Sequence, residues 1–268
     1  MTSKAPSPLG VSTQTNIEHA PPVQDDDYEL HVYDHCPYCI RVELIMGLND
    51  IPYRRIVYGY GEGAPPEKGG YGLGPVALTG KKILPVLVGL GVPTEGSMKG
   101  LPESLDIIAF LTGKHRLVVP CFTGRLDDWI GRYSPIRRNL ARPRETSIPG
   151  KDWAKEADKA YARQKYEATG FDYVKAMTET STYLRKVDQL LVELDGILVN
   201  NGEGGIDSPV TLTKLTGGCY GMDDIIALPA VRALTIVKGV KWPPKVKKWL
   251  DGAFQRCEQV DLYYDFAC

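Results

Sequence analysis

The chain of 268 residues is long enough for two domains, each with its own core. Its apolar fraction of 43% and charged fraction of 24% are ordinary for a globular protein, and its net charge of −1 argues against nucleic acid or an anionic membrane as a partner. No apolar run approaches the roughly 20 residues of a membrane-spanning helix, and six cysteines are too few for a disulfide scaffold. We therefore expect a cytoplasmic protein, with an organelle as the remaining alternative.

Residues 1–27 have the composition of a disordered tail. They hold Pro, Ser and Thr, the acidic run Asp25-Asp26-Asp27 and few large apolar side chains. They lack the apolar segment of a secretory signal and the arginines of a transit peptide. The folded part of the chain is therefore expected to begin at residue 28.

The next segment predicts a β-α-β unit. Residues 29–33 form an apolar strand, residues 37–48 carry apolar side chains at helical spacing, and residues 53–58 form a second strand. Pro37 fits the first helical turn, where a backbone N–H is not needed. A connection this short gives parallel strands.

A glycine-rich segment separates this unit from the rest of the first domain. Residues 59–80 predict an extended loop with one weak helical turn. Residues 84–88 predict a third strand, residues 92–98 a weak fourth strand or bend, and Glu103-Ser104 the start of a helix. The order of strand, helix, strand, hairpin and helix is that of a thioredoxin-like α/β fold.

The second half of the chain predicts an all-α domain. From about residue 127, apolar residues recur at intervals of three and four, and Pro229 is expected to kink one buried helix or to end its first segment. The clearest helices are expected at 152–168, 173–198, 222–237 and 245–256. The chain is thus divided into a tail (1–27), a thioredoxin-like domain (28–113), a linker (114–126) and a helical domain (127–268).

The tetrapeptide Cys36-Pro37-Tyr38-Cys39 joins the first strand to the first helix. Unpaired N–H groups and the helix dipole favour the thiolate at this position, where the pKa of a thiol falls from about 8.5 to ~3.5–7.5. Cys36 is the predicted nucleophile because it lies at the exposed end of the turn. Cys39, three residues on, is the predicted resolving thiol, and the pair is expected to form a redox-active disulfide. His35 could assist the thiolate electrostatically or lie solvated in the loop.

Two other uses of such a cysteine pair are a zinc site and a structural disulfide. A zinc site needs a second pair of cysteines or histidines at matching spacing, and the remaining cysteines are single. A purely structural disulfide is disfavoured because a Cys-x-x-Cys loop is strained and easily reduced. We therefore predict no metal site. The single cysteines are Cys121, Cys219, Cys257 and Cys268.

Together, these motifs resemble the glutaredoxins, and specifically the two-domain glutaredoxin 2 type, which has a glutathione-transferase-like architecture. The resemblance runs from about residue 28 to about residue 260. It rests on Tyr33-Asp34-His35-Cys36-Pro37-Tyr38-Cys39, Leu84-Pro85-Val86-Leu87, Pro102-Glu103-Ser104-Leu105-Asp106-Ile107, Asp223-Asp224-Ile225, Leu228-Pro229 and Trp242-Pro243.

The resemblance implies a monomeric glutathione-dependent oxidoreductase. Glutathione is then a co-substrate with no permanently bound cofactor, and glutathionylated proteins or small mixed disulfides are substrates. Pro85 matches a cis-proline, and the backbone of Leu84 would pair with the glutathione cysteinyl amide. Glu103 and Ser104 would hold the γ-glutamyl group, unless Ser104 is only a local helix cap. Tyr38 would either pack on glutathione or be an ordinary packing residue.

Two departures from the resemblance affect the site and its surroundings. The loop 59–80 is longer and richer in glycine than expected, and Gly221 replaces the usual Ser or Thr cap of the buried helix, so that the reciprocal side-chain bond of a capping box is lost. Lys81 and Lys82 could attract a carboxylate of glutathione, although paired lysines usually belong to a solvated loop.

Two rival functions remain open at this point. One is a cysteine-type glutathione transferase or dehydroascorbate reductase on the same fold, although the second thiol argues against it. The other is a non-enzymatic module that binds a partner and uses the dithiol to hold a metal or an iron–sulfur cluster.

Overall fold

A four-stranded sheet organises the first half of the chain. The computed structural model describes residues 28–119, 121–198 and 220–268. Within these residues the sheet has the order β2-β1-β3-β4, with β1 parallel to β2 and antiparallel to β3, and with β3 antiparallel to β4. The strands are β1 (Tyr28–Val32), β2 (Tyr53–Val57), β3 (Val86–Val88) and β4 (Leu101–Pro102).

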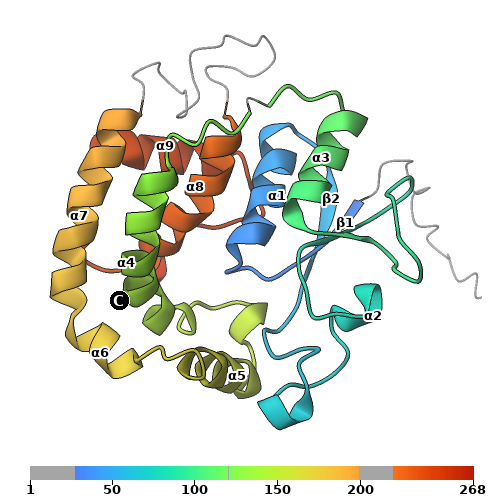
Figure 1. Cartoon of the computed structure of the whole chain (residues 1–268), viewed down its shortest axis with the longest axis horizontal. Helices are drawn as coiled ribbons and strands as arrows, with labels where there is room; N and C mark the ends of the chain where they lie inside the picture. Colours follow the sequence, from blue (N-terminus) through green and yellow to red (C-terminus); the bar gives the residue numbers. More distant parts are fainter. Residues whose placement is uncertain (1–27, 120, 199–219) are drawn as a thin grey trace, which may run out of the picture.

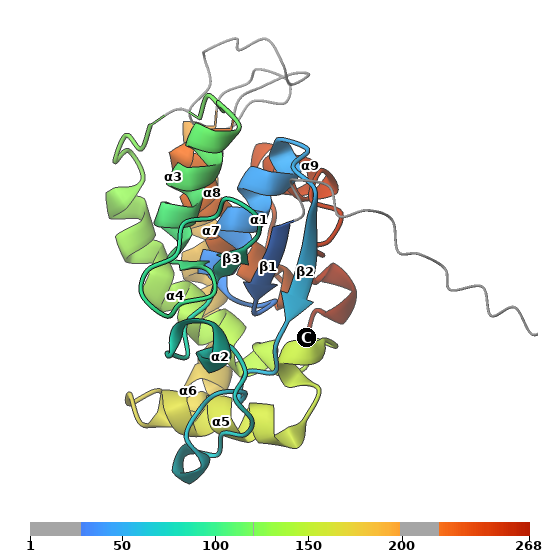
Figure 2. The ribbon, with the colours of Figure 1, turned by 90° about the vertical axis from the view of Figure 1, so that its right-hand side faces the viewer.

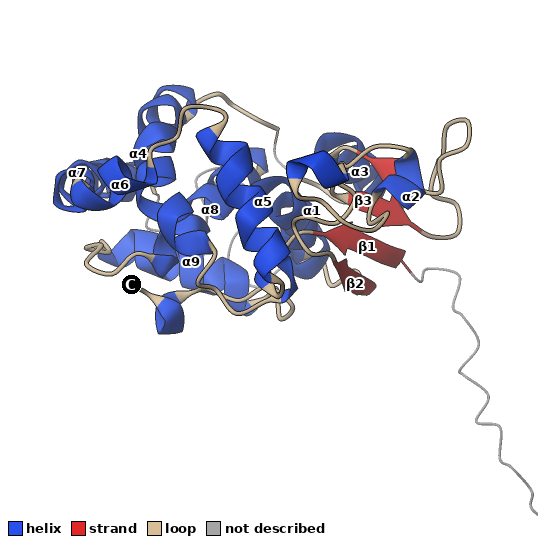
Figure 3. Cartoon of the chain, turned by 90° about the horizontal axis from the view of Figure 1, so that it is seen from below, coloured by secondary structure: helices blue, strands red, loops and turns tan. Residues whose placement is uncertain are grey.

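Two helices share the buried core of this sheet, namely α1 (Pro37–Leu48) and α3 (Ser104–Lys114). The sheet and the two helices share a hydrophobic core, in which Leu30 of β1, Leu44 of α1 and Ile107 of α3 are fully buried. The β-α-β unit and the thioredoxin-like fold predicted for this half are thereby confirmed. Figure 3 places the strands at one end of the molecule and most of the helices at the other.

The second half of the described chain is helical, as predicted. It surrounds α8, most of whose side chains are buried, and Figure 1 shows α4, α7 and α9 around that helix. The α-helices are α4 (Asp127–Glu145), α5 (Glu156–Glu167), α6 (Tyr173–Thr178), α7 (Thr180–Ile197), α8 (Met222–Arg232) and α9 (Pro244–Gln255), and the 3₁₀ helices are η2 (Lys151–Trp153), η3 (Ala233–Ile236) and η4 (Tyr264–Phe266). None of the helices in the three described ranges is both long and apolar enough to cross a membrane. The tail 1–27 lies outside the described residues, and the division at 114 and 127 stays a prediction.

One predicted helix differs from the structure, and the structure decides between the two alternatives for another segment. Of the two alternatives for residues 92–98, a weak strand or a bend, the strand is absent because Pro93 cannot donate to a ladder and most of the segment is exposed. The fourth strand is β4 instead. The predicted helix 173–198 is two helices, α6 and α7. Thr178 and Thr180 flank the break and donate their hydroxyls to the Val174 and Ala176 carbonyls, which is a pattern that bends helices.

The capping of α8 is retained in part. Gly221 has no side chain to cap the helix, but its N–H donates to the Asp224 carboxylate over 2.9 Å. The α-helical hydrogen bonding of this predicted 222–237 element ends at Arg232, three residues after Pro229, and the chain continues as η3. One half of the capping box therefore survives the glycine.

The glycine-rich loop is hydrogen-bonded to the helical half of the chain. It contains one 3₁₀ turn, η1 (Pro66–Lys68), and one helical turn, α2 (Val76–Thr79), and it runs from β2 toward α5 (Figures 1 and 2). The fully buried Asp158 of α5 accepts hydrogen bonds from the N–H of Gly61 and the hydroxyl of Tyr71, both over 2.8 Å. A Cβ atom on Gly70 would lie 2.0 Å from the Ala64 carbonyl oxygen, so glycine is required there.

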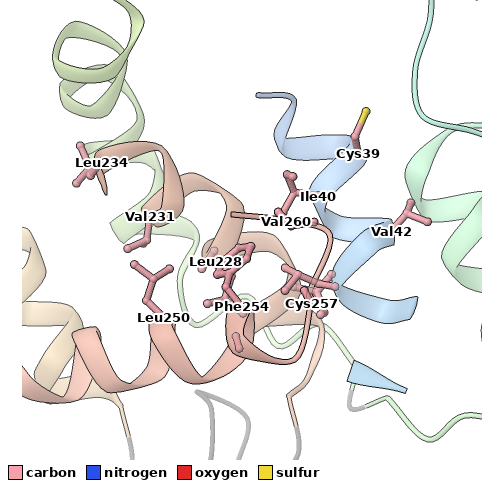
Figure 4. Close-up of a cluster of buried hydrophobic side chains, with 14 of the residues drawn as sticks. Cys39, Ile40, Val42, Leu228, Val231, Leu234, Leu250, Phe254, Cys257 and Val260 are labelled. Carbon is pink, nitrogen blue, oxygen red and sulfur yellow. The ribbon is translucent and has the colours of Figure 1, made fainter. Parts of the chain in front are cut away.

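The two halves meet along α1. Figure 4 shows Ile40 of α1 beside the side chains of Leu228, Phe254 and Val260 from the helical half. Arg232 of α8 is 2% exposed and crosses between the halves: its Nη1 donates to the Asp34 carbonyl over 3.0 Å and its Nε to the Asp261 carbonyl over 2.8 Å. Helix α1 is thus covered by the sheet on one side and by the helical half on another.

One carboxyl group lies inside this packing. Glu43 of α1 is fully buried, and the Nε of Arg55 donates to its Oε1. Burial raises the pKa of Glu43 to about 7, although Arg55 opposes the shift. The folded protein therefore holds a proton on Glu43 in a pH range where the unfolded chain has lost it.

This pKa predicts how stability depends on pH. Between the usual carboxyl pKa of 4.5 and about 7 the folded state binds more protons than the unfolded state, so the free energy of unfolding falls as pH rises. The contribution of Glu43 to that fall is up to about 3 kcal/mol. Glu43→Gln is expected to flatten the curve measured by urea unfolding between pH 4.5 and 8. An equally steep fall in the variant would contradict this assignment.

Candidate active site

The cysteine pair lies where the sequence predicts, at the start of α1. Cys36 is the N-cap residue, Pro37 occupies the first turn, and Cys39 is fully buried within that turn. The N–H of Cys36 donates to the Tyr33 carbonyl over 3.2 Å, which closes the turn that follows β1. Cys36 is half-buried, so only the first thiol is placed near solvent.

The two thiols ionise differently. A hydrogen bond from Cys39 lowers the pKa of Cys36 to about 7 against the opposing effect of burial, and His35 and the N–H groups of Cys39 and Tyr38 add to the lowering. Burial raises the pKa of Cys39 well above the ordinary thiol value. Near neutral pH the first sulfur is therefore about half thiolate, while the second stays a thiol.

His35 does not lie in a solvated loop. Its side chain is 10% exposed, and its ring packs 4.7 Å from the Tyr60 ring and 4.6 Å from the Trp153 ring between centroids. Its Nδ1 contacts the Asp152 carboxylate, which belongs to η2 of the helical half. The predicted alternative of a solvated histidine is therefore wrong.

Two lysines approach the same aromatic group. Lys82 Nζ donates to the Tyr33 hydroxyl over 2.6 Å and lies 4.9 Å from the centre of the Tyr60 ring. Lys165 of α5 donates to the Tyr60 hydroxyl over 2.7 Å. Burial lowers the pKa of Lys82 to about 8, so this lysine is held in the fold and is not the solvated loop residue that a lysine pair usually is.

Strand register places the remaining predicted residues at the same end of the sheet. His31 pairs with Val86, so the cis Leu84–Pro85 bond lies beside the end of β1 that leads to Cys36. Val86 also pairs with Pro102, which puts Glu103 next to Pro85. The sheet thus gathers the dithiol turn, the cis-proline and the start of α3.

The start of α3 differs from a simple serine cap. Glu103 occupies the N-cap position with φ of 69°, an uncommon value for a residue other than glycine, and its side chain makes no capping bond. Ser104 is 5% exposed and is the first helical residue. Ser104 is therefore not the N-cap residue that the local-cap alternative required.

Tyr38 lies on the outer surface of the turn. Its side chain is 54% exposed, and the Arg41 guanidinium lies 4.8 Å from the centre of its ring. The ring is not part of the core. If Tyr38 is only a packing residue, as one prediction has it, the contact with Arg41 is the packing that it provides. Its role toward glutathione stays a prediction.

Comparison with protein families identifies the second half of the chain. Residues 125–267, more than half of the protein, match the family model described as "Glutaredoxin 2, C terminal domain". The chain belongs to the glutaredoxin 2 family. It is a glutathione-dependent thiol–disulfide oxidoreductase, as the sequence predicts, and the family assignment favours this activity over the transferase and binding-module alternatives.

Individual relatives extend the match over the glutaredoxin domain. Glutaredoxin 2 of Escherichia coli K12 is 25% identical over 246 residues, which cover 89% of this chain and 99% of the relative. The crystal structure of glutaredoxin 2 from Salmonella typhimurium in complex with glutathione has a TM-score of 0.74 at 23% identity, with 90% of this chain and 99% of that chain covered. This structure supports the two-domain fold of the present glutaredoxin.

The sequence did not predict the helical-half contribution to this glutaredoxin site. The sequence pattern puts Asp152 at the start of a long charged helix and makes Lys165 one of several charged residues within it. Neither carries a motif, because each reaches the site through a contact between residues more than 100 positions apart. The described residues contain no group of three or more metal-ligating side chains.

Proposed function

We propose that this glutaredoxin reduces glutathionylated proteins and small mixed disulfides through Cys36 and Cys39. The observation that supports this most directly is the split ionisation of the pair, with the pKa of Cys36 at about 7 and that of Cys39 raised by burial. A nucleophile with a pKa near ambient pH combines a useful thiolate fraction with high intrinsic reactivity. Cys39 keeps its proton until Cys36 has reacted.

The reaction begins when the Cys36 thiolate attacks the glutathione sulfur of a mixed disulfide. The S–S bond of the substrate breaks, the substrate sulfur leaves as a thiolate and takes a proton, and Cys36 is left in a disulfide with glutathione. A second glutathione thiolate then attacks the glutathione sulfur, which releases glutathione disulfide and restores the Cys36 thiolate. Cys36 is thus oxidised in the first step and reduced in the second.

A dithiol route is available for protein disulfides. After Cys36 attacks, Cys39 loses its proton and displaces the substrate thiolate, which forms the Cys36–Cys39 disulfide. Two glutathione molecules then reduce this bond. Glutaredoxin potentials of roughly −200 to −230 mV lie near the glutathione pool, so the direction follows the pool. Such chemistry suits a reducing compartment, for which we propose the cytoplasm, with a monomer as the working form.

We place glutathione at the sheet end that carries Leu84, Pro85 and Glu103. Within the described residues the backbone of Leu84 forms no hydrogen bond, and β3 begins only at Val86, so the Leu84 N–H and carbonyl are available to pair with the cysteinyl amide as an added strand does. The γ-glutamyl carboxylate would take the backbone N–H groups and Ser104 hydroxyl at the start of α3, while Glu103 accepts from the ammonium. The related Salmonella protein was solved in complex with glutathione.

The assignment of Ser104 can be tested by kinetics. Ser104→Ala is expected to raise the KM for glutathione by about tenfold, because a hydrogen bond to a charged carboxylate contributes about 1.5 kcal/mol or more. Thr112→Ala, on the same helix but away from its start, is the matched control and should leave KM unchanged. A lower free energy of unfolding with no change in KM would favour a purely local role for Ser104.

Substrate preference tests the proposed reaction as a whole. Turnover of hydroxyethyl disulfide, an electrophilic acceptor and dehydroascorbate is measured side by side with glutathione in excess. The disulfide should be the preferred substrate. Faster turnover of either other substrate would support the transferase or dehydroascorbate reductase alternative in place of this proposal.

A further inference from the structure

We propose that Asp152 is a positioning residue of the helical domain that holds His35 as an imidazolium beside Cys36, so that the reactivity of the nucleophile depends on the docking of that domain. The inference deepens the proposed function, since it takes Cys36 as the nucleophile. The Asp152 carboxylate is 1% exposed, although it is separated from the cysteine turn by more than 100 residues.

Both carboxylate oxygens of Asp152 are directed at the turn that carries the nucleophile. The N–H of Asp34 donates to Oδ1 over 2.9 Å, and the N–H of His35 donates to Oδ2 over 2.8 Å. The His35 Nδ1 also contacts Oδ2. One side chain from η2 therefore fixes the backbone and the imidazole of the two residues that precede Cys36.

The charge of Asp152 needs a partner in this buried position. No lysine or arginine within the described ranges forms an ion pair with Asp152, whereas His35 does. A buried carboxylate without a counter-charge is costly, so the pair is favoured with a proton on the imidazole. The hydrogen bond to Nδ1 also sets the orientation of the ring.

Several groups face His35, and their net effect favours its charged form. Burial lowers the pKa of His35, but Asp152, then Glu145 of α4 and the neighbouring Cys36 raise it, and the balance is a raised pKa. The Tyr33 and Tyr60 rings pack against the imidazole. Burial raises the pKa of each phenol, so both stay neutral near pH 7.

The loop after β2 holds Asp152 in place. The N–H of Tyr60 donates to the backbone carbonyl of Asp152 over 2.9 Å, and the Tyr60 and Trp153 rings enclose the imidazole from two sides. Asp158, in contrast, binds the same loop at Gly61 and Tyr71 without a bond to His35. The two buried carboxylates therefore differ in that only Asp152 bonds to His35.

The test compares the pH dependence of Cys36 alkylation in Asp152→Asn and Asp158→Asn. The full chain is treated with iodoacetamide, and each cysteine is followed by mass spectrometry of its peptide, so no turnover is needed. Asp152→Asn keeps an acceptor for the turn but removes the charge. It should raise the alkylation midpoint of Cys36 by about one pH unit, and the His35 imidazole should titrate at a lower pH by NMR.

Asp158→Asn should leave both midpoints where they are in the wild type. Unchanged midpoints in Asp152→Asn, or an equal shift in Asp158→Asn, would overturn the proposal. If Asp152→Asn does not fold, His35→Gln replaces it and should shift the Cys36 midpoint in the same direction. Failure of the proposed function is distinguishable, because it would appear as retained turnover in Cys36→Ser, whatever the midpoints are.

Discussion

Cys36→Ser is expected to lower the turnover of hydroxyethyl disulfide by more than about a thousandfold, because covalent catalysis has no route without the first thiolate. The measurement is the glutathione-coupled reduction assay at pH 7 with the full chain. Serine fits the half-buried position at the N-cap of α1 and is a good capping residue, so stability should change little. Full activity in this variant would show that another group attacks the substrate.

Cys39→Ser is the matched control for the first substitution. Its hydroxyl can still donate to the Cys36 sulfur, and this hydrogen bond is the main cause of the low pKa of Cys36. The one-thiol reaction with a glutathionylated peptide should therefore remain, while reduction of a protein disulfide should be lost. Loss of both reactions in Cys39→Ser would mean that the second thiol takes part in every turnover.

Arg232→Met is expected to lower the free energy of unfolding by about 3–5 kcal/mol, as is usual when one member of a buried ionic network is removed. The guanidinium is 2% exposed, donates to the carbonyls of Asp34 and Asp261, and lies 3.6 Å from an oxygen of the Asp34 carboxylate. Methionine fills much of the volume but removes the charged donor from all three acceptors, and Asp34 keeps only the weaker Tyr263 hydroxyl at its carbonyl. Urea unfolding followed by tryptophan fluorescence measures the change.

Tyr263→Phe serves as the control for Arg232→Met. It removes the hydrogen bonds from the tyrosine hydroxyl to Oδ2 of Asp34 over 2.9 Å and to the Asp34 carbonyl over 3.3 Å, and should cost about 1 kcal/mol. Its ring still packs 4.1 Å from the Arg232 guanidinium. If Arg232→Met costs no more than Tyr263→Phe, the guanidinium does not hold the two halves together.

Local sequence patterns predicted most of the fold. The helix at 37–48 has the expected bounds because Pro37 starts it and apolar spacing sustains it, and the cis bond before Pro85 follows the resemblance. The segment 92–98 left a strand and a bend open because its alternation is weak, and the structure has no strand there because Pro93 blocks pairing. The two-residue β4 gives too short a pattern to be detected.

The site was predicted only where a motif marked it. Cys36 and Cys39 follow from their spacing and from the helix start, whereas the partners of His35 come from distant parts of the chain. A charged segment such as 152–168 looks like a solvated helix face, and nothing in its periodicity shows which carboxylate is buried. The contribution of the helical domain to the site could therefore be identified only from the tertiary structure.

The position of α1 between the sheet and α8 has a consequence for how the protein can be divided. A fragment that lacked the helical half would expose the hydrophobic side of α1 that carries Ile40 to water. The Asp34 carbonyl would also lose its guanidinium donor. The two halves are therefore not independent domains that can be separated or exchanged. We expect them to fold as one cooperative unit, with the interface between them beside the Cys36 sulfur.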